Sequence, residues 1–372
     1  MKGWAERMNI EIAKILEADI ATAIWKEDCY NAHDMGFHGK IFEIHPDFRR
    51  GLLGFLRMKW AFFRSNITQD YDTILFSNEA ITGIHSIRKG TKTMYYAHSI
   101  SRHLFDLKED YEKKVPKIIR PFYRIANFLL KELYIWELQK IDVIFVNSLT
   151  NKNRIKEWIW RDDAIILPPP VDTKAFSPHT KENVENIIQG IWLNYKDYYI
   201  SFARLTHVKR IDSIIRTFQQ FPDKKVLILY GPHDSQKNEF IQLGTGYPNI
   251  IFHTLSDNNL LPTFISWAIA SIAVSKQEDF WMVAIESMAC GVPVIAVQEW
   301  WFQESILDGI TGQFISPNDI EGVLGKSIQS FDSTRSKEME QSCINHSKNY
   351  SLEKFSETLL SHIQKLHETE KN

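Results

Sequence analysis

Short apolar runs alternate with longer amphipathic segments along most of this chain. The runs of strand length in the first half are Thr73–Ser77, Thr93–His98, Ile141–Asn147 and Ala164–Leu167. Those in the second half are Tyr198–Phe202, Lys225–Tyr230, Asn249–Phe252, Ser271–Val274 and Pro293–Val297. Continuous apolar strands separated by segments of helix length are typical of parallel sheets with both faces covered. The pattern therefore predicts an α/β protein made of two doubly wound domains that face each other across a cleft.

A change of composition divides the two sets of strands. Three consecutive prolines, Pro168–Pro170, precede a polar stretch from His179 to Asn194, as is typical of a linker between domains. We expect an N-terminal domain over residues 1–172, a linker over 173–196 and a C-terminal domain over 197–348. Residues 349–372 form a final segment, because the apolar positions of Leu352–Leu366 recur at helical spacing and need another surface to cover them.

The beginning of the chain departs from the doubly wound pattern. Residues Ala5–Glu17 already have the pattern of a first helix, and no strand-like run precedes them. A doubly wound domain starts from a strand. Either the start is misplaced, with the true N-terminus upstream, or the domain is trimmed.

The overall composition excludes several classes of protein. At 372 residues, 44% hydrophobic and 24% charged, the chain is neither disordered nor collagen-like. A formal net charge of −2 offers no general basic field for nucleic acid. Three widely spaced cysteines exclude a disulfide scaffold and fit a reducing compartment. No apolar stretch reaches the ~18 residues of a membrane span, so we expect a soluble cytoplasmic protein.

The segment from Ser275 to Thr311 is the most informative for chemistry. After the strand Ser271–Val274 come Glu278-Asp279-Phe280, and a helix then starts at Trp281. Helix N-termini beyond parallel strands bind phosphate, and carboxylates beside such a site accept hydrogen bonds from sugar hydroxyls. Glu278 and Glu286 are candidates for that role. Alternatively, Glu278 is a partner of the helix dipole and Glu286 lies on a solvated helix face.

Two cations follow the strand Tyr198–Phe202. Arg204 and Lys209 leave its carboxyl end, where ligands bind in open α/β sheets. A planar guanidinium and a mobile ammonium together suit a diphosphate. By itself, either cation would be interpreted as a solvated surface residue. Because we also expect a helix N-terminus at the same sheet, the interpretation that the two cations bind an anionic ligand is favoured.

Nothing in the sequence has the spacing of a metal site. No Cys or His cluster matches zinc spacing. Asp70-Tyr71-Asp72 precedes the strand Thr73–Ser77 instead of following it, so we interpret it as a loop and expect no metal.

Together these segments resemble the retaining GT-B glycosyltransferases, a large family that includes mannosyltransferases of polysaccharide assembly. The likeness covers nearly the whole chain, and the motifs are specific in combination. The matching segments are Ser201–Ile211, the Glu-x7-Glu motif at Glu278–Glu286, Ala289–Ala296, Asp308–Gly312, and the mannosyltransferase-like Tyr96–Ser99 with Arg102 and Asp106. The resemblance implies two Rossmann-like domains, with the final helix packing back toward the N-terminal one.

The resemblance also implies roles for individual residues. The C-terminal domain would hold a nucleotide-sugar donor, and the N-terminal domain would hold the acceptor. The catalytic residues would be Glu278, His98, Arg204 and Lys209. Glu278 would contact the donor sugar hydroxyls, His98 would reach the sugar, and the two cations would neutralise the departing diphosphate. The donor-binding residues would be Arg204, Lys209, Glu278, Asp279, Phe280, Trp281, Met282 and Glu286, with Glu286 on the ribose. His98 is otherwise an ordinary histidine at the end of a strand.

The resulting prediction is a metal-independent, retaining hexosyltransferase without a cofactor. Its donor would be a nucleotide sugar, with GDP-mannose as the best match, and its acceptor a glycan or lipid-linked saccharide in polysaccharide biosynthesis. One alternative is a catalytically impaired nucleotide-sugar-binding or scaffold subunit of the same fold. Another is a nucleotide-sugar epimerase with the same two-domain architecture, which no motif supports.

One segment of the expected N-terminal domain is rich in both basic and apolar residues. Arg49–Arg64 holds five basic and no acidic residues among Leu, Phe and Trp. Further cations are Lys113, Lys114, Lys117, Arg120 and Arg124. These residues predict either a surface for anionic lipid, with the protein peripheral on the inner face of the cell membrane, or a half-buried helix with solvated ends.

Tryptophan stands where the resembled family usually has glycine. The positions are Trp4, Trp160, Trp281, Trp300 and Trp301. The chain has 16 glycines and 11 tryptophans, whereas about 26 glycines are ordinary for this length. UGA encodes glycine in some bacteria and tryptophan in others. We therefore hypothesise that many of these tryptophans are glycines in the native protein. If they are genuine, the scaffold alternative gains support.

Overall fold

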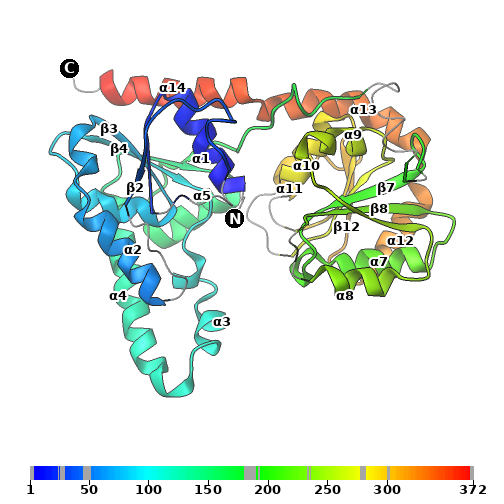
Figure 1. Cartoon of the computed structure of the whole chain (residues 1–372), viewed down its shortest axis with the longest axis horizontal. Helices are drawn as coiled ribbons and strands as arrows, with labels where there is room; N and C mark the ends of the chain where they lie inside the picture. The colour runs from blue at the N-terminus through cyan, green and yellow to red at the C-terminus, as the bar shows by residue number, and fades with distance from the viewer. Residues whose placement is uncertain are drawn as a thin grey trace. The chain divides into compact units, whose positions relative to one another are not determined.

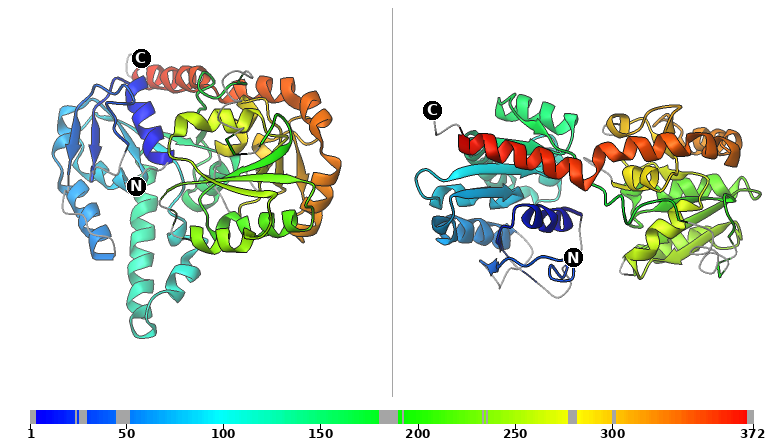
Figure 2. Two further views of the ribbon diagram at one scale, coloured as in Figure 1. Left: turned by 45° about the vertical axis from the view of Figure 1, so that its right-hand side comes forward. Right: turned by 90° about the horizontal axis from the view of Figure 1, so that it is seen from above.

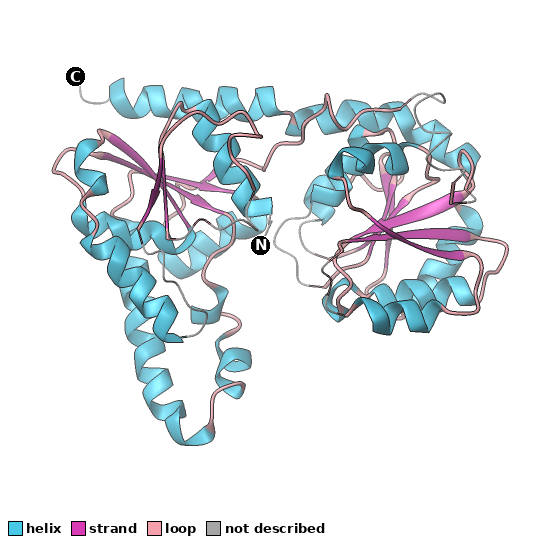
Figure 3. Ribbon diagram, in the orientation of Figure 1, coloured by secondary structure: helices cyan, strands magenta, loops and turns pink. Residues whose placement is uncertain are grey.

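The computed structural model describes residues 4–23, 25, 30–44, 52–179, 190–191, 193–232, 234, 236–276, 282–299 and 302–368. The chain divides into two compact units, which are considered separately. Residues 1–168 with 356–372 form the first unit, and residues 169–355 form the second (Figure 1). Both units are α/β, with strands packed among helices (Figure 3).

The first unit contains two parallel sheets. The larger has the order β3-β4-β5-β6, and the smaller pairs β1 with β2. The strand bounds are β1 Ile20–Thr22, β2 Ile41–Glu43, β3 Thr73–Ser77, β4 Lys92–Ala97, β5 Val143–Val146 and β6 Ile165–Ile166. The central strands β4 and β5 are almost wholly buried, which explains the runs Met94–Ala97 and Val143–Val146, which contain no charged residue.

Helices cover these sheets, and one helical hairpin projects from them. The helix bounds are α1 Trp4–Ile15, α2 Leu52–Arg64, α3 Lys108–Lys113, α4 Arg120–Gln139, α5 Leu149–Arg154 and α14 Leu352–Glu368. The hairpin of α3 and α4 extends away from the sheet of its own unit (Figure 2). In the part of the chain that is described, no helix combines the length and apolarity that a membrane crossing requires.

The second unit has one parallel sheet in the order β12-β11-β10-β7-β8-β9. Its strand bounds are β7 Tyr198–Phe202, β8 Lys225–Tyr230, β9 Ile250–Thr254, β10 Ser271–Ala273, β11 Val294–Val297 and β12 Gly312–Ile315. Its helix bounds are α7 Ile211–Gln219, α8 Lys237–Gly244, α9 Leu261–Ser266, α10 Met282–Ala289, α11 Phe302–Ser305, α12 Ile320–Ser330 and α13 Ser333–Ser347. The strand order reverses between β7 and β10, which is where doubly wound sheets bind their ligands.

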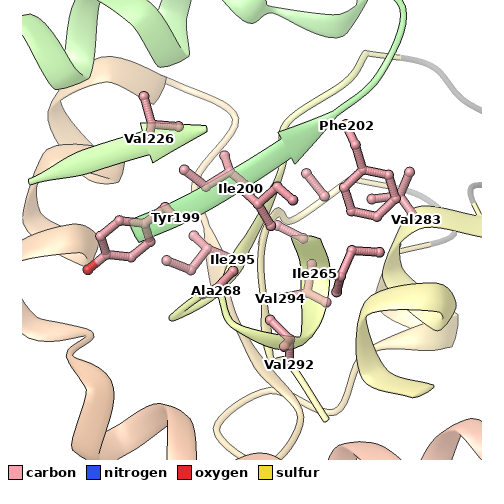
Figure 4. Close-up of a cluster of buried hydrophobic side chains, with 14 of the residues drawn as sticks. Tyr199, Ile200, Phe202, Val226, Ile265, Ala268, Val283, Val292, Val294 and Ile295 are labelled. Atoms are coloured by element: carbon pink, nitrogen blue, oxygen red, sulfur yellow. The ribbon is translucent and has the colours of Figure 1, made fainter. Parts of the chain in front are cut away.

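The core of the second unit fills both faces of this sheet. Side chains of β7 and β11, such as Ile200 and Ile295, pack with Ile265 of α9 and Val283 of α10 (Figure 4). Because helices cover both faces, these strands carry almost no polar residue.

The structure confirms the α/β fold with parallel sheets and refines the expected elements. Strands β3, β7 and β8 have the predicted bounds, whereas β1, β2 and β12 were not predicted. The expected linker begins as part of the second unit. His179 N donates to Ser266 Oγ at 3.2 Å, and Ser266 Oγ donates to Ser177 O at 3.2 Å.

Candidate functional site

Two loops meet at the point where the strand order of the second unit reverses. One follows β7 and carries Arg204 and Lys209, and the other follows β10. The backbone N–H of Lys276 donates to the carbonyl of Val208 at 2.8 Å. The loop with the two predicted cations therefore lies directly against the segment that leads to Glu278.

The two cations differ in their surroundings. Arg204 is exposed, whereas Lys209 is only 6% exposed and ends a 3₁₀ turn, His207–Lys209. A charge in such a low-dielectric position acts more strongly on an anion than an exposed charge does. The sequence identified both cations, and only the structure separates the buried one from the exposed one.

Arg210 holds the ends of two strands together and was not singled out from the sequence. Its guanidinium donates to Val274 O at 3.1 Å and to Glu299 Oε1 at 3.0 Å. Val274 follows β10 and Glu299 follows β11. Arg210 also has a left-handed backbone, with φ 51°, at the N-cap position just before α7. The dipeptide Lys209-Arg210 was the available signal, but its partners are distant in sequence.

Asp234 fixes the β7 loop from the other side. Its Oδ2 accepts from Leu205 N at 3.0 Å and from Gly231 N at 3.3 Å, which links the loop after β7 to the end of β8. The carboxylate thus uses backbone donors to hold Arg204, the neighbour of Leu205, at the carboxyl edge of the sheet.

Helix α10 begins at Met282 and carries Glu286, and both residues are half-buried. Ser287 Oγ anchors this helix by donating to Ser271 Oγ of β10 at 2.6 Å. The predicted residues Glu278, Asp279, Phe280 and Trp281 lie outside the described residues, so their roles remain predictions. Between β10 and that segment, Ser275 Oγ is buried without a hydrogen-bond partner in the part that is described.

His98 directly follows β4 in the first unit and is buried and neutral. Burial lowers the pKa of His98 to about 3. Its Nε2 lies 2.8 Å from Asn9 Oδ1 of α1, so the neutral ring donates from Nε2. Its carbonyl accepts from Asn147 Nδ2 at 2.8 Å. At neutral pH, the ring of His98 therefore carries no charge.

The other residues of the histidine-containing segment pair with each other. Arg102 donates to Asp106 through Nη2 at 2.7 Å and through Nε at 3.0 Å. The loop Asp70-Tyr71-Asp72 is likewise engaged in protein contacts, since Asp72 pairs with Arg88 and Tyr71 bonds to Asp19. Within the described ranges, no three His, Cys, Asp or Glu side chains are grouped so as to hold a metal ion.

Trp160 is the one residue of the tryptophan hypothesis whose side chain is described. It ends the π-helical turn Ile155–Ile159 with φ 61° and ψ 34°, in the left-handed region, and is 69% exposed. Glycine is the usual residue at such a helix end. This geometry supports the hypothesis at position 160. Trp281, Trp300 and Trp301 lie outside the described residues, as does the side chain of Trp4.

In sequence, about half of the chain is similar to known glycosyltransferases. Residues 185–350 match the model of the family described as glycosyl transferases group 1. The chain is 24% identical to D-inositol 3-phosphate glycosyltransferase of Mycobacterium sp. (strain KMS) over 194 residues, or 50% of this chain and 43% of that protein. The enzyme of the same name from Mycolicibacterium smegmatis is 25% identical over 163 residues. The chain spans less than half the length of these curated relatives.

Comparison of the structure extends the likeness to nearly the whole chain. A glycosyltransferase from Rickettsia africae has a TM-score of 0.76 at 16% identity, covering 98% of this chain and 97% of that one. Anabaena Alr3699/HepE, solved in complex with UDP and glucose, has a TM-score of 0.76 at 16% identity, covering 97% and 96%. WaaG, a glycosyltransferase involved in lipopolysaccharide biosynthesis, has a TM-score of 0.70 at 15% identity, covering 96% and 95%.

These identities are low enough that the structural likeness concerns the fold. The specific match to mannosyltransferases that the sequence suggested does not appear among these relatives. Residues 185–350 match the family model of the glycosyl transferases group 1, and the chain shares its α/β fold with these solved glycosyltransferases.

Proposed function

We propose that this chain is a retaining, metal-independent glycosyltransferase that transfers a hexose from a nucleotide sugar to a glycan or lipid-linked saccharide. The observation that carries the proposal is the meeting of the β7 and β10 loops in the region that matches the group 1 model, held by the bond from Lys276 N to Val208 O. Because these two loops are in contact, buried Lys209 and exposed Arg204 lie on the same edge of the sheet as the segment that leads into α10.

The proposed chemistry follows from where charge develops. As the bond at the anomeric carbon breaks, negative charge accumulates on the departing diphosphate. Lys209 and Arg204 would stabilise that charge without a metal. Glu286 would accept hydrogen bonds from the ribose, and Glu278 from the sugar hydroxyls. His98 would act as a hydrogen-bonding group on the sugar, because its ring is neutral at neutral pH.

The proposed donor is GDP-mannose, from the likeness of the segment around His98 to mannosyltransferases. The complex of Anabaena Alr3699/HepE with UDP-glucose makes UDP-glucose the first competitor to test. The names of the curated relatives make an inositol phosphate a useful acceptor to include beside lipid-linked saccharides.

Ligand-induced thermal stabilisation and calorimetry with GDP-mannose and UDP-glucose test the donor site. A lost charge-assisted hydrogen bond is worth about 1.5–3 kcal/mol, so Lys209→Ala or Arg204→Ala should weaken donor binding about 10- to 100-fold. Lys326→Ala, an exposed cation of α12, is the matched control. Parent-like donor affinity in both variants would refute the assignment of the diphosphate site.

Variants of the two glutamates test donor binding and sugar transfer separately. Glu286→Ala should weaken nucleotide-sugar binding, whereas Glu278→Ala should mainly lower turnover. A protein that binds the donor but transfers no sugar to any acceptor would support the catalytically impaired alternative. Conversion of the free donor sugar without an acceptor would support an epimerase.

We further propose that the protein acts at the surface of an anionic membrane through the α3–α4 hairpin. Exposed apolar side chains recur at helical spacing on one side of it: Ile118, Phe122, Ile125 and Leu129. From residue 113 to 131 the chain carries six cations and no acidic residue. An apolar stripe with nearby cations is typical of interfacial binding.

Co-sedimentation with lipid vesicles tests this surface. The parent should bind vesicles that contain phosphatidylglycerol and should release them at high salt. Phe122→Ser should reduce binding, while Ile310→Ser, an exposed apolar residue of the second unit, should not. Equal binding by both variants would refute the proposed surface.

A further inference from the structure

A buried line of hydrogen bonds leads from helix α5 to the backbone of His98. Strands β4 and β5 pair in parallel as far as Ala97 and Val146. One position further along, the side chain of Asn147 donates from Nδ2 to the carbonyl of His98 at 2.8 Å. This side-chain bond extends the pairing of β4 and β5 by one position and fixes the backbone of His98 at the carboxyl edge of the sheet.

The amide of Asn147 is itself held in one orientation. Its Oδ1 accepts from Ser148 Oγ at 3.0 Å and from Asn151 Nδ2 at 2.6 Å. The amide of Asn151 is oriented in turn, because its Oδ1 accepts from Arg154 Nη1 at 3.0 Å. From Arg154 through the two amides, every donor therefore points toward the carbonyl of His98, and each bond polarises the next.

Arg154 also approaches the other end of the segment that begins at His98. Its Nη2 lies 3.9 Å from Asp106 Oδ2. The same carboxylate accepts from Arg102 Nη2 at 2.7 Å and from Arg102 Nε at 3.0 Å. Residues 98–106, which lead from β4 toward α3, are thus held at both ends by groups that contact the last residue of α5.

A separate contact holds the middle of segment 98–106. Ser101 Oγ donates to Glu79 Oε1 at 2.9 Å, and Lys59 Nζ lies 2.9 Å from Glu79 Oε2. A segment that polar side chains hold at its start, middle and end keeps one geometry. Such support is what a group that takes part in a reaction requires.

The side chains of this line are almost completely removed from solvent. Asn147 and Asn151 are 0% exposed, and Arg154 is 6% exposed. Burying a charged group is costly, and well-packed apolar side chains in place of buried ion pairs are often neutral or stabilising. Support of α5 would therefore not require an arginine, whereas orienting two amides toward the carbonyl of His98 does.

We propose that Arg154 is a positioning residue for the proposed sugar transfer, because it fixes the backbone of His98 and the end of segment 98–106. The inference rests on the proposed role of His98 on the donor sugar. The ring of His98 takes its place from this backbone and from Asn9, whose Oδ1 lies 2.8 Å from Nε2. Without Arg154, the amides of the line are free to turn, and the histidine no longer keeps one position.

A double-mutant cycle on turnover tests whether Arg154 acts through His98. Arg154→Met keeps an unbranched side chain and should lower kcat about 10- to 100-fold, with the donor KM within about twofold of the parent, because a misplaced group slows the reaction without weakening donor binding. In the His98→Ala background the same change should alter turnover by less than about twofold, because the residue through which it acts is gone. Losses that multiply in the double variant would overturn the proposal, as would parent-like kcat in Arg154→Met.

Further variants separate positioning from general support of the fold. Arg161→Met is the matched control, because Arg161 is a half-buried arginine of the same unit that donates to Leu138 O of α4 at 3.0 Å. It should lower thermal stability and leave kcat unchanged. Arg154→Lys keeps a donor for Asn151 and should recover part of the turnover, whereas Asn151→Leu interrupts the line and should lower kcat as Arg154→Met does. Equal losses of kcat in Arg154→Met and Arg161→Met would mean a merely structural role and would overturn the proposal.

Hydrogen exchange gives a readout that does not depend on sugar transfer. The amides of Leu104 and Phe105 donate to carbonyls within segment 98–106. They should exchange at least about tenfold faster in Arg154→Met than in the parent, and they should be unchanged in Arg161→Met. Unchanged exchange in Arg154→Met would overturn the positioning role. Faster exchange in a protein that transfers no sugar would refute the proposed function and support the positioning of the segment by Arg154.

Discussion

Replacing Trp160 by glycine and, separately, by alanine would measure what its left-handed backbone costs. The residue has φ 61° and ψ 34°, close to the ideal left-handed helix. A residue with a Cβ pays roughly 1–2 kcal/mol there, while glycine pays about 0.5–1 kcal/mol in chain entropy. Trp160→Gly should therefore be more stable than Trp160→Ala by about 1 kcal/mol. Both variants lose the same indole ring, so its contribution cancels in the comparison.

Urea unfolding of both variants, monitored by a probe in the first unit, is the assay. In thermal unfolding, which is a second assay, a difference of 1 kcal/mol corresponds to roughly 2–4 °C in the melting temperature of a unit of this size. The matched control is Glu132, an exposed residue inside α4. There the order should reverse, with Glu132→Ala about 1 kcal/mol more stable than Glu132→Gly. If alanine is also the better residue at position 160, the argument from backbone geometry is wrong.

The remaining predictions concern decoding, pH, the site scaffold and packing. Peptides from the native organism that cover Trp160 and Trp281 should have the mass of glycine at those positions, with UGA codons in the gene; UGG codons would refute the decoding hypothesis. Burial lowers the pKa of His98 from 6.5 to about 3, so the unfolded chain binds a proton between these values that the folded chain does not, and stability falls as pH drops through this range. From pH 7 to pH 5 the contribution lost is about 2 kcal/mol, and unfolding titrations of His98→Gln should lack this part of the slope. Arg210→Ala should cost about 1–3 kcal/mol of stability and weaken donor binding, because Val274 O and Glu299 lose a charged partner; calorimetry beside Arg216→Ala, an exposed arginine of α7, checks this. Gly312→Ala would put a Cβ 2.1 Å from Val294 O and should destabilise the second unit by at least 1–3 kcal/mol, whereas Gly231→Ala, with nothing within 4 Å of its Cβ, should be close to neutral in thermal unfolding.

Two of the strands predicted with the correct bounds, β7 and β8, are mostly apolar because helices cover both faces of their sheet. β3 was also predicted with the correct bounds, although four of its five residues are only half-buried. β1, β2 and β12 have three or four residues, many of them only half-buried. Runs that short, next to polar residues, do not differ from loops in sequence, and pairing with a neighbouring strand is what makes them strands.

In the candidate site, too, some features could be predicted from the sequence and others could not. The position of Arg204 and Lys209 after an apolar strand was sufficient to select them, because ligands gather at the carboxyl ends of parallel strands. The supporting bonds were not visible in the sequence. Arg210 reaches residues 64 and 89 positions away, and Asp234 reaches Leu205 29 positions away.

The sequence by itself determined the parallel α/β architecture and the position of Arg204 and Lys209 after a strand of the second unit, and it suggested the glycine–tryptophan hypothesis, which stays a prediction. These depend on local composition and on the order of strands and helices, which any part of the chain displays without its partners. The tertiary structure decided which cation is buried, how Arg210 holds two strand ends together, and that β1 and β3 both line one cavity. Burial, long-range hydrogen bonds and strand pairing depend on contacts between distant residues, and those contacts exist only in the folded chain.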